Sequence, residues 1–410
     1  MQQLTYIDLF AGAGGLSEGF IKNGFVPIAH LEMNENACTT IRTRIAYHYL
    51  KNNNNIHIYN EYLLGKITRQ QLYSFIPQKI LNSIINVKIE NNTIPDIFES
   101  IDNFLGKNKI DIIIGGPPCQ AYSLIGRARD PNKMRYDDRN FLFRLYSEFL
   151  KKYKPKYFVF ENVKGLLSAN NHFNQMLELF QSNEIGYTVS WKILNAFDYG
   201  VLQSRERVII IGKRGNDNFQ FPELKKIINK WSVKNDLFRD LPILKPGSNK
   251  PVMEYAGDIT YYLKKFKLRN GSKTLTQHIT RPHNSLDLKI YELAIKKWLG
   301  ERKRLHYSEL PKELKTHKNQ ISFLDRFKVI DPSSYSHTIV AHIAKDGHYY
   351  IYPDLKQIRS LSVREAARIQ SFPDDYFFEG GRTSAFNQIG NAVPPLMAQE
   401  LAKQLKKLFL

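Results

Sequence analysis

The strongest constraint in this sequence is an alternation of short apolar runs with helical patterns through the first 213 residues. The runs are β-branched or aromatic and are bounded by Gly or Pro, which is typical of buried strands. They occupy residues 4–10, 25–31, 110–114, 157–160 and 208–211. The clearest helix between them is predicted at residues 138–152, where apolar side chains recur at helical spacing. This succession predicts an α/β fold with a doubly wound, mostly parallel sheet, whose ligands lie at the carboxyl ends of the strands.

The second half of the chain has a different pattern, in which Pro and Gly turns and basic residues replace the alternation. Two further helical patterns follow near the end: Ser362 and Glu365 form a capping box before the first, and Pro394-Pro395 opens the second. A chain of 410 residues is long enough for two domains. We expect residues 1–213 to form a cofactor-binding domain that contains a peripheral insertion of helix and loop at residues 51–109. Residues 214–351 should form a second, smaller domain, and residues 352–410 should form C-terminal helices that complete the first domain.

The chain is strongly basic, with 59 Lys and Arg against 39 Asp and Glu and a net charge of +20. Residues 214–351 hold 26 basic and 14 acidic residues, whereas the other 272 residues carry only +8. This excess favours a polyanion partner, nucleic acid first, although a solvated surface also carries such charge. Cys38 and Cys119 are too far apart to suggest a disulfide framework or a CxxC metal site. No run approaches the roughly 18 apolar residues of a membrane span. We expect a soluble, cytoplasmic protein.

Two features indicate a nucleotide-like cofactor. Residues 8–16, DLFAGAGGL, place a glycine-rich turn between the first strand and the first helix, where backbone can approach a ligand and helix N–H groups are free. The spacing differs from the dinucleotide GxGxxG pattern, and a plain tight turn would look similar. The second strand ends in Glu32, and a carboxylate at this position of a doubly wound sheet binds a ribose hydroxyl. Together they predict an adenosine-containing cofactor.

Reactive side chains follow the later strands. Cys119 ends the segment GGPPC, whose glycines and prolines fix the backbone at the functional edge of the sheet. A buried cysteine is usually an inert hydrophobe, but this setting favours a rigidly presented thiolate. Glu161 lies at the end of the fourth strand. Considered by itself it would be interpreted as a surface carboxylate, but beside a nucleophile it is a candidate proton donor. Arg205 and Arg207 precede the last predicted strand and should face the same way. Two such guanidinium groups suit binding of phosphate or of a base carbonyl, and pairing with carboxylates at a surface strand edge is an equally open interpretation.

Six segments, in this order and approximate spacing, resemble the bacterial DNA (cytosine-5)-methyltransferase family of restriction–modification systems. They read DLFAGAGGLSEGF, PPCQAYS, ENV, QSRERVIIIG, SVREAARIQSFPDDY and GNAVPP. The resemblance covers residues 4–32, about 110–213 and about 337–410. Residues 214–351 correspond to the variable target-recognition domain of that family, so no recognition sequence follows from the resemblance.

The resemblance implies S-adenosylmethionine as cofactor, double-stranded DNA as partner and no metal. It also implies roles for individual residues. The cofactor site comprises Phe10, Gly12, Gly14, Gly15, Leu16, Glu32, Asn391 and Val393. The catalytic residues are the nucleophile Cys119, the proton donor Glu161, and Arg207. The substrate contacts are Pro118, Gln120, Ser123, Asn162, Gln203 and Arg205. Two departures concern the adenine: Glu90 is the candidate for an acidic residue usually found after the third strand, and Met33 stands where many members have an aromatic.

These residues lead to one main hypothesis and two alternatives. In the main hypothesis, Cys119 adds to carbon 6 of a cytosine rotated out of duplex DNA, and carbon 5 then accepts the methyl group. Residues 214–351 and four arginines after Cys119, namely Arg127, Arg129, Arg135 and Arg139, would read the sequence. One catalytic set per chain makes a monomer sufficient. The alternatives are a methyltransferase for structured RNA and a catalytically silent DNA-binding protein.

Overall fold

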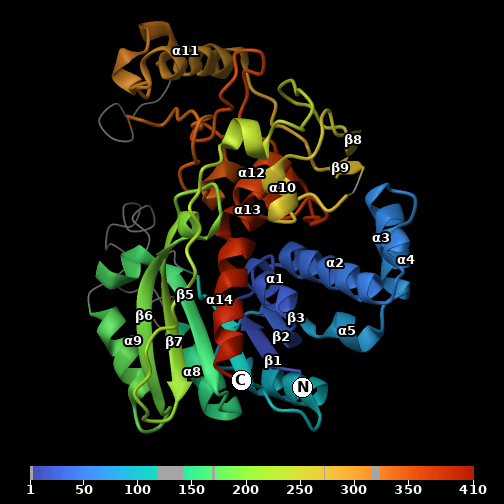
Figure 1. Ribbon diagram of the computed structural model, residues 1–410, viewed down its shortest axis with the longest axis vertical. Helices are drawn as coiled ribbons and strands as arrows, with labels where there is room; N and C mark the ends of the chain where they lie inside the picture. Colours follow the sequence, from blue (N-terminus) through green and yellow to red (C-terminus); the bar gives the residue numbers. More distant parts are fainter. Residues whose placement is uncertain (1–2, 119–141, 169–170, 272, 316–323) are drawn as a thin grey trace.

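The structure is a computed structural model that describes residues 3–118, 142–168, 171–271, 273–315 and 324–410. Several expectations lie outside these ranges. They concern Cys119, Gln120, Ser123, the four arginines at 127, 129, 135 and 139, and the first four residues of the helix expected at 138–152. The described chain forms a lower lobe built on one large sheet and an upper lobe of helices, turns and a small two-stranded sheet (Figure 1).

The lower lobe contains a seven-stranded sheet in the order β3-β2-β1-β4-β5-β7-β6. The strands are β1 (Thr5–Leu9), β2 (Val26–Glu32), β3 (Ile84–Asn86), β4 (Ile112–Gly115), β5 (Tyr157–Val163), β6 (Tyr187–Asn195) and β7 (Glu206–Arg214). All neighbours from β3 to β5 pair in parallel, and β7 is antiparallel to both β5 and β6. The predicted doubly wound, mostly parallel sheet is confirmed. All five strands expected from the apolar runs are present.

Both faces of this sheet are covered because its strands are apolar on both sides. Along β4, Ile112 and Ile114 belong to one core cluster and Ile113 to another, as side-chain alternation requires. One face is covered by α6 (Ile94–Leu105), α8 (Leu142–Tyr153) and α9 (His172–Gln181), and the other by α1 (Gly15–Lys22) and α14 (Pro395–Lys407). In Figure 1, α14 runs down the sheet beside α1.

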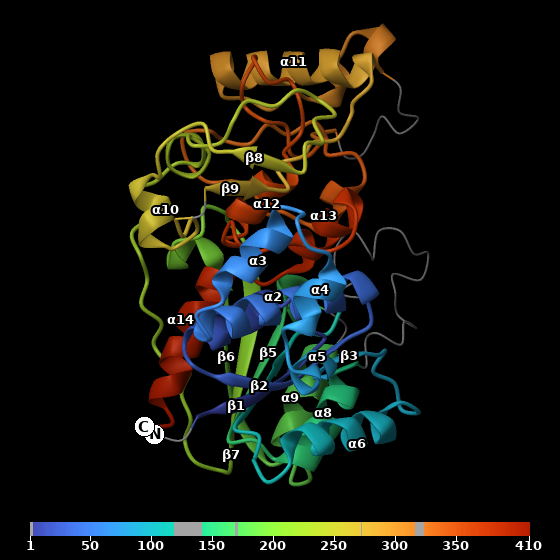
Figure 2. The ribbon, with the colours of Figure 1, turned by 90° about the vertical axis from the view of Figure 1, so that its right-hand side faces the viewer.

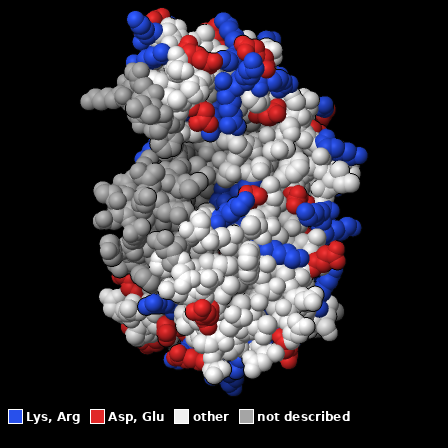
Figure 3. Space-filling view, turned by 90° about the vertical axis from the view of Figure 1, so that its left-hand side faces the viewer, with Lys and Arg blue, Asp and Glu red and all other residues white. Residues whose placement is uncertain are grey.

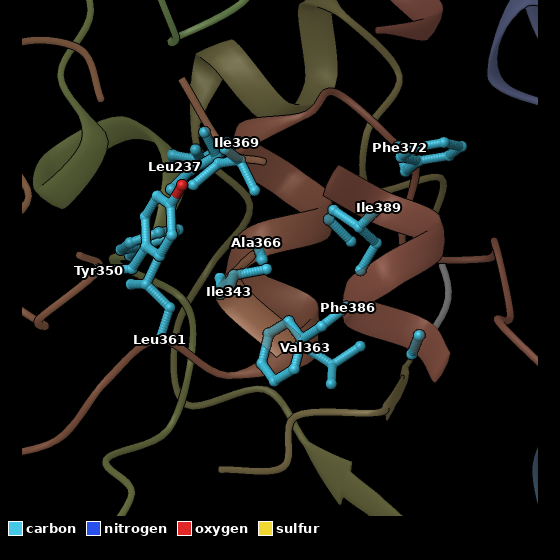
Figure 4. Close-up of a cluster of buried hydrophobic side chains, with 14 of the residues drawn as sticks. Leu237, Ile343, Tyr350, Leu361, Val363, Ala366, Ile369, Phe372, Phe386 and Ile389 are labelled. Atoms are coloured by element: carbon cyan, nitrogen blue, oxygen red, sulfur yellow. The ribbon is translucent and has the colours of Figure 1, made fainter. Parts of the chain in front are cut away.

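The upper lobe is organised around α12 (Val363–Ile369) and α13 (Arg382–Asn391). Figure 4 shows that the apolar side chains of these two helices pack with residues from earlier in the chain, among them Leu237, Ile343 and Tyr350. Ser362 and Glu365 form the expected capping box at the start of α12. The two-stranded antiparallel sheet of β8 (Val252–Glu254) and β9 (Thr274–Thr276) and the helices α10 (Tyr261–Lys265) and α11 (Ser285–Glu301) complete the lobe (Figure 2). No helix in the described ranges has the length and apolar content needed to cross a membrane.

The C-terminal segment 352–410 is shared between two cores. The buried side chains of α12 and α13 join the upper core, whereas Met397, Leu401 and Leu405 of α14 pack against the sheet. Only α14 therefore completes the lower lobe as we expected for the whole segment. The domain boundaries at residues 213 and 351 remain a prediction.

The interpretation of residues 51–109 as a peripheral insertion is wrong in part. The first portion does form a small satellite core: α3 (Ile56–Leu63), α4 (Arg69–Ser74) and α5 (Gln78–Asn82) pack against the end of α2 (Glu35–Asn52). The second portion belongs to the main sheet. Here β3 pairs in parallel with β2, and α6 buries Ile97 and Ile101 against the same face as α8. A three-residue strand carries too little pattern to be recognised in an Asn-rich sequence.

The first and last helices of the chain cross at Gly19. A Cβ atom added at Gly19 would lie 2.4 Å from the carbonyl carbon of Ala398 and 2.4 Å from the amide nitrogen of Gln399. No side chain larger than hydrogen fits there without moving α14. This crossing fixes the helix that follows the glycine-rich turn.

We expect Gly19→Ala to lower the free energy of unfolding by about 1–3 kcal/mol, because the methyl group overpacks a backbone contact. The matched control is Gly300→Ala in α11, where an added Cβ meets no atom within 4 Å. That control should be neutral or stabilising by up to about 1 kcal/mol, since Ala is the better helix former. Denaturant unfolding of both variants tests this, and equal stability would contradict the crossing.

Candidate active site

A pocket opens at the carboxyl ends of β1, β4 and β5, beneath the upper lobe. The strand order reverses between β1 and β4, and such a switch point is where open α/β sheets bind ligands. The pocket is lined by Asp8, Phe10, Ala11, Gly12, Gly15, Leu16, Gly116, Glu161, Asn391, Ala392 and Val393. Seven of the predicted site residues are therefore brought together here: Phe10, Gly12, Gly15, Leu16, Glu161, Asn391 and Val393.

The glycine-rich turn forms the first wall of this pocket. Phe10, Gly12 and Gly14 all have left-handed backbone, with φ of 57°, 55° and 75°, and Gly14 is the N-cap of α1. Glu32 supports the turn because its Oε2 accepts a hydrogen bond from the Gly12 amide at 2.9 Å. A Cβ on Gly15 would lie 2.3 Å from the carbonyl oxygen of Val393, so backbone packs directly on backbone. Gly14 and Glu32, the two predicted cofactor residues outside the lining, thus shape the turn.

Asp8 is a pocket residue that the sequence analysis did not assign. It is 1% exposed, and its Oδ2 has no hydrogen-bond partner. Burial raises the pKa of the Asp8 carboxyl well above its ordinary value, and the nearby charge of Glu32 raises it further. An unpartnered buried carboxylate is costly unless a ligand donates to it. The sequence signal that could have identified Asp8 was its position as the one acidic residue inside the apolar run of β1.

Glu161 lines another wall of the pocket, and Arg207 holds its carboxylate from outside the lining. Arg207 Nε donates to Glu161 Oε1 at 2.8 Å, and both side chains are largely buried. A Cβ on Gly116 would lie 2.6 Å from Glu161 Oε2, so the missing side chain makes room for this carboxylate. The neighbouring Asn162 is 1% exposed, and its Nδ2 donates to the carbonyl oxygen of Pro117 at 3.3 Å. The ends of β4 and β5 are thereby tied together just before Pro118 and Cys119.

Gln203 and Arg205 lie in a buried network next to the pocket. Arg205 donates to the carbonyl oxygens of Ile339 at 2.7 Å and Gly390 at 3.1 Å. Gln203 accepts from the Ile339 amide at 2.6 Å and donates to Gln370 Oε1 at 2.8 Å. Both side chains are at most 1% exposed. The structure therefore gives them contacts between lobes, while their roles toward DNA remain predictions. Arg205 precedes β7 rather than belonging to it.

The residue at the end of the third strand, where we expected the adenine contact, is not Glu90. The third strand, β3, ends at Asn86, and Asn86 Nδ2 donates to the carbonyl oxygens of Glu32 and Met33 at 3.1 and 3.0 Å. Glu90 lies four residues further on, where it pairs with Lys88. Met33 is 62% exposed beside this strand end. Asn86 therefore occupies the place that the sequence analysis sought for Glu90.

The other chemistry-bearing groups in the described part of the chain point to no second site. The described residues contain no group of three or more His, Cys, Asp or Glu side chains that could hold a metal ion. Cys38 is fully buried in α2, and burial raises the pKa of its thiol to about 11. It has the properties of a structural cysteine.

Comparison with known proteins decides the family. Residues 4–407 match the family model described as C-5 cytosine-specific DNA methylase. The chain belongs to this family. It is thus a DNA (cytosine-5-)-methyltransferase, as the resemblance of its six segments implied.

Similarity to individual proteins extends over the whole chain. It is 41% identical to the type II methyltransferase M.Bpa9945I of Bacillus paralicheniformis, covering 98% of both chains. It is 32% identical to the type II methyltransferase M.DdeI of Desulfomicrobium norvegicum, covering 99% of this chain and 89% of that protein. Among solved structures, an E. coli prophage protein assigned as a DNA modification methyltransferase shares the fold, with a TM-score of 0.64, 23% identity and 99% coverage of both chains.

Gly116→Ala should displace the Glu161 carboxylate, because the new methyl group would occupy the space within 2.6 Å of Oε2. We expect the single-turnover rate of methyl transfer to fall at least about tenfold, since Glu161 is the predicted proton donor and small misplacements of a reacting group are costly. Gly381→Ala is the matched control, because an added Cβ there meets nothing within 4 Å. A wild-type rate in Gly116→Ala would contradict the role of this contact.

Proposed function

We propose that this enzyme transfers the methyl group of S-adenosylmethionine to carbon 5 of a cytosine rotated out of duplex DNA, as the modification enzyme of a type II restriction–modification system. The observation that carries the proposal is one pocket with two chemically different walls. Asp8 and the glycine-rich turn form the wall suited to a cofactor, and Glu161 held by Arg207 forms the wall suited to a base. The similarity to type II methyltransferases over 98% of the chain supports the biological setting.

The cofactor wall fits S-adenosylmethionine. When bound, this group supplies an electrophilic methyl on a sulfonium. Asp8 Oδ2, which has no partner, would accept from its ammonium group. Glu32 already accepts the Gly12 and Asn34 amides at 2.9 and 2.8 Å, yet a carboxylate has further lone pairs for ribose hydroxyls. The turn around Gly12 and Gly15 would allow close backbone approach.

The base wall suits activation of cytosine, whose carbon 5 is a poor nucleophile. In our proposal the Cys119 thiolate forms a bond to carbon 6, and Glu161 in its protonated form donates a proton to ring nitrogen 3. The resulting electron-rich carbon 5 would take the methyl group as the sulfur–methyl bond of the sulfonium breaks, which leaves a neutral thioether. Loss of the carbon 5 proton to solvent, with return of the nitrogen 3 proton to Glu161, would then break the bond between carbon 6 and the Cys119 sulfur and release the thiolate. Arg207 orients Glu161 and would contribute positive charge near Cys119.

Reaction at the face of the base requires cytosine to leave the stack, at a cost of about a few kcal/mol. Phosphate contacts from the basic residues 214–351 would offset this cost and make affinity fall with salt. On the face shown in Figure 3, Lys and Arg side chains lie over the upper lobe and at the level where the two lobes meet. Because one chain contains both walls of the pocket, we propose that a monomer suffices.

Cys119→Ala should abolish methyl transfer, because Cys38, the other cysteine of the sequence, is buried in α2 and cannot replace it. The test is bisulfite sequencing of DNA from cells that express the wild type or the variant, which also reports the recognition sequence. Cys38→Ala is the matched control and should keep wild-type methylation. Methylation by Cys119→Ala would overturn the mechanism, and faster methylation of tRNA than of duplex DNA would favour the RNA alternative.

Asp8→Asn separates cofactor binding from stability. A carboxyl whose pKa is raised on folding makes the cofactor-free protein less stable as pH rises through that pKa, and Asn removes this loss. At about pH 8 the cofactor-free variant should melt at or above the wild-type temperature, while the Kd for S-adenosylhomocysteine rises at least about tenfold through loss of a charged hydrogen bond. As pH rises and the Asp8 carboxyl ionises, the affinity for S-adenosylhomocysteine should increase more in the wild type than in the variant.

Calorimetric titration and thermal unfolding measure both effects. Asp111→Asn is the control, because Asp111 is a buried carboxylate at the other end of the sheet and accepts the Thr5 amide at 2.9 Å. It should lower stability and leave cofactor affinity unchanged. Wild-type affinity in Asp8→Asn would contradict the assignment.

A further inference from the structure

The glycine-rich turn is anchored to β2 on one side. The Ala11 amide donates to the carbonyl oxygen of Leu31 at 3.0 Å, and the Gly12 amide donates to Glu32. On another side, the hydroxyl of Tyr376 donates to the carbonyl oxygen of Ala13. We propose that Tyr376 is a positioning residue that holds the turn in its cofactor-binding conformation. This inference rests on the proposed use of S-adenosylmethionine.

The position of Ala13 makes this hydrogen bond informative. Ala13 lies between Gly12 and Gly14, both of which have left-handed backbone. Glycine permits that conformation but does not enforce it, since glycine has many accessible alternatives. A hydrogen bond to the peptide between them restrains both glycines at once. The Tyr376 oxygen also lies 3.1 Å from the position that a Cβ atom would take at Gly14, so it lies beside two successive residues of the turn.

Tyr376 is itself held rigidly. It is 1% exposed, and its ring packs against Phe372 and Phe378 with centroid distances of 4.7 and 5.3 Å. The guanidinium carbon of Arg44 lies 4.7 Å from the centre of the same ring. Burial holds the pKa of the Tyr376 hydroxyl far above its ordinary value, which keeps it a donor. The hydroxyl is therefore fixed before any ligand arrives.

Arg44 extends this restraint to the helices around the turn. It donates to both carboxylate oxygens of Glu18 in α1, at 2.9 and 2.6 Å, and to Asp375 Oδ1 at 2.9 Å. Its side chain is 4% exposed, so this cluster is shielded from water and from salt. The segment after α12 is thus fastened both to the start of α1 and to the turn that precedes it. Tyr376 and Ala13 also share the core of the upper lobe.

These contacts imply an effect on affinity rather than on chemistry. Tyr376 is not among the residues that line the pocket, so it acts through the turn. Without its hydroxyl, Ala13 loses a buried hydrogen bond and the turn gains alternative conformations in the free enzyme. Binding must then select the competent conformation, which weakens apparent affinity in proportion to its lost population.

The experiment uses Tyr376→Phe in the full chain and measures the Kd for S-adenosylhomocysteine by calorimetry. We expect Kd to rise about fivefold to tenfold, as for the loss of one buried hydrogen bond. At saturating cofactor, kcat should stay within about twofold, so that the change appears in KM for the cofactor. Hydrogen exchange in the cofactor-free variant should be faster at amides 11–16 and unchanged in β2.

Tyr262→Phe is the matched control. Tyr262 is 0% exposed, and its hydroxyl donates to the carbonyl oxygen of Gly200 at 2.7 Å, away from the pocket. It should lose similar stability with no change in cofactor affinity. An unchanged Kd in Tyr376→Phe, or an equal rise in both variants, would overturn the inference. Failure of the wild type to bind S-adenosylhomocysteine would instead overturn the proposed function.

Discussion

The first and last helices of this protein cross with backbone against backbone, and the active-site geometry depends on that contact. At Gly19 the backbone of α14 leaves no space for a side chain, and four residues earlier Gly15 meets the carbonyl of Val393. The pocket therefore has one wall from the beginning of the chain and another from its end. Asn391 and Val393 reach the glycine-rich turn only because α14 lies along the sheet beside α1.

Buried charge defines how the upper lobe is assembled. Arg368 is 0% exposed and bonds to Asp240 and Asp374, both at 2.6 Å, while Arg359 bonds to Glu365 at 2.7 Å. Such pairs add little net stability compared with well-packed apolar residues, but breaking one partner is costly. These ion pairs fix the orientation of α12, because each pair can form in only one arrangement of this helix against its neighbours. The same segment then continues into Asp375 and Tyr376, which contact the lower lobe.

The sequence predicted the parts of the fold whose pattern is local. The five expected strands, the capping box at Ser362 and the opening of α14 at Pro395 are all present, because short apolar runs and caps are set by neighbouring residues. It did not predict β3 or the division of residues 352–410 between two cores. Apolar spacing shows that a helix has a buried face, but not which surface covers it.

The site was predictable to a similar degree. The residues that follow strands were found because parallel strands end at one edge, and the family resemblance supplied their order. The position of Asp8 beside the pocket and the contacts of Arg205 were not predictable, since both depend on how distant segments pack. Cys119, Gln120 and Ser123 lie outside the described residues, and the roles of all the predicted site residues remain predictions.

The crossing of the end helices also constrains how the molecule is made. A ribosome releases the glycine-rich turn first and the segment that closes over it almost 400 residues later. During that interval α1 lacks the helix that packs against it, and the sheet lacks one of its covers. Such long-range closure is slow and leaves nascent chains open to association. A nascent chain that has not yet released Asn391 and Val393 lacks two residues of the pocket lining, so the pocket is completed only after this late segment is made.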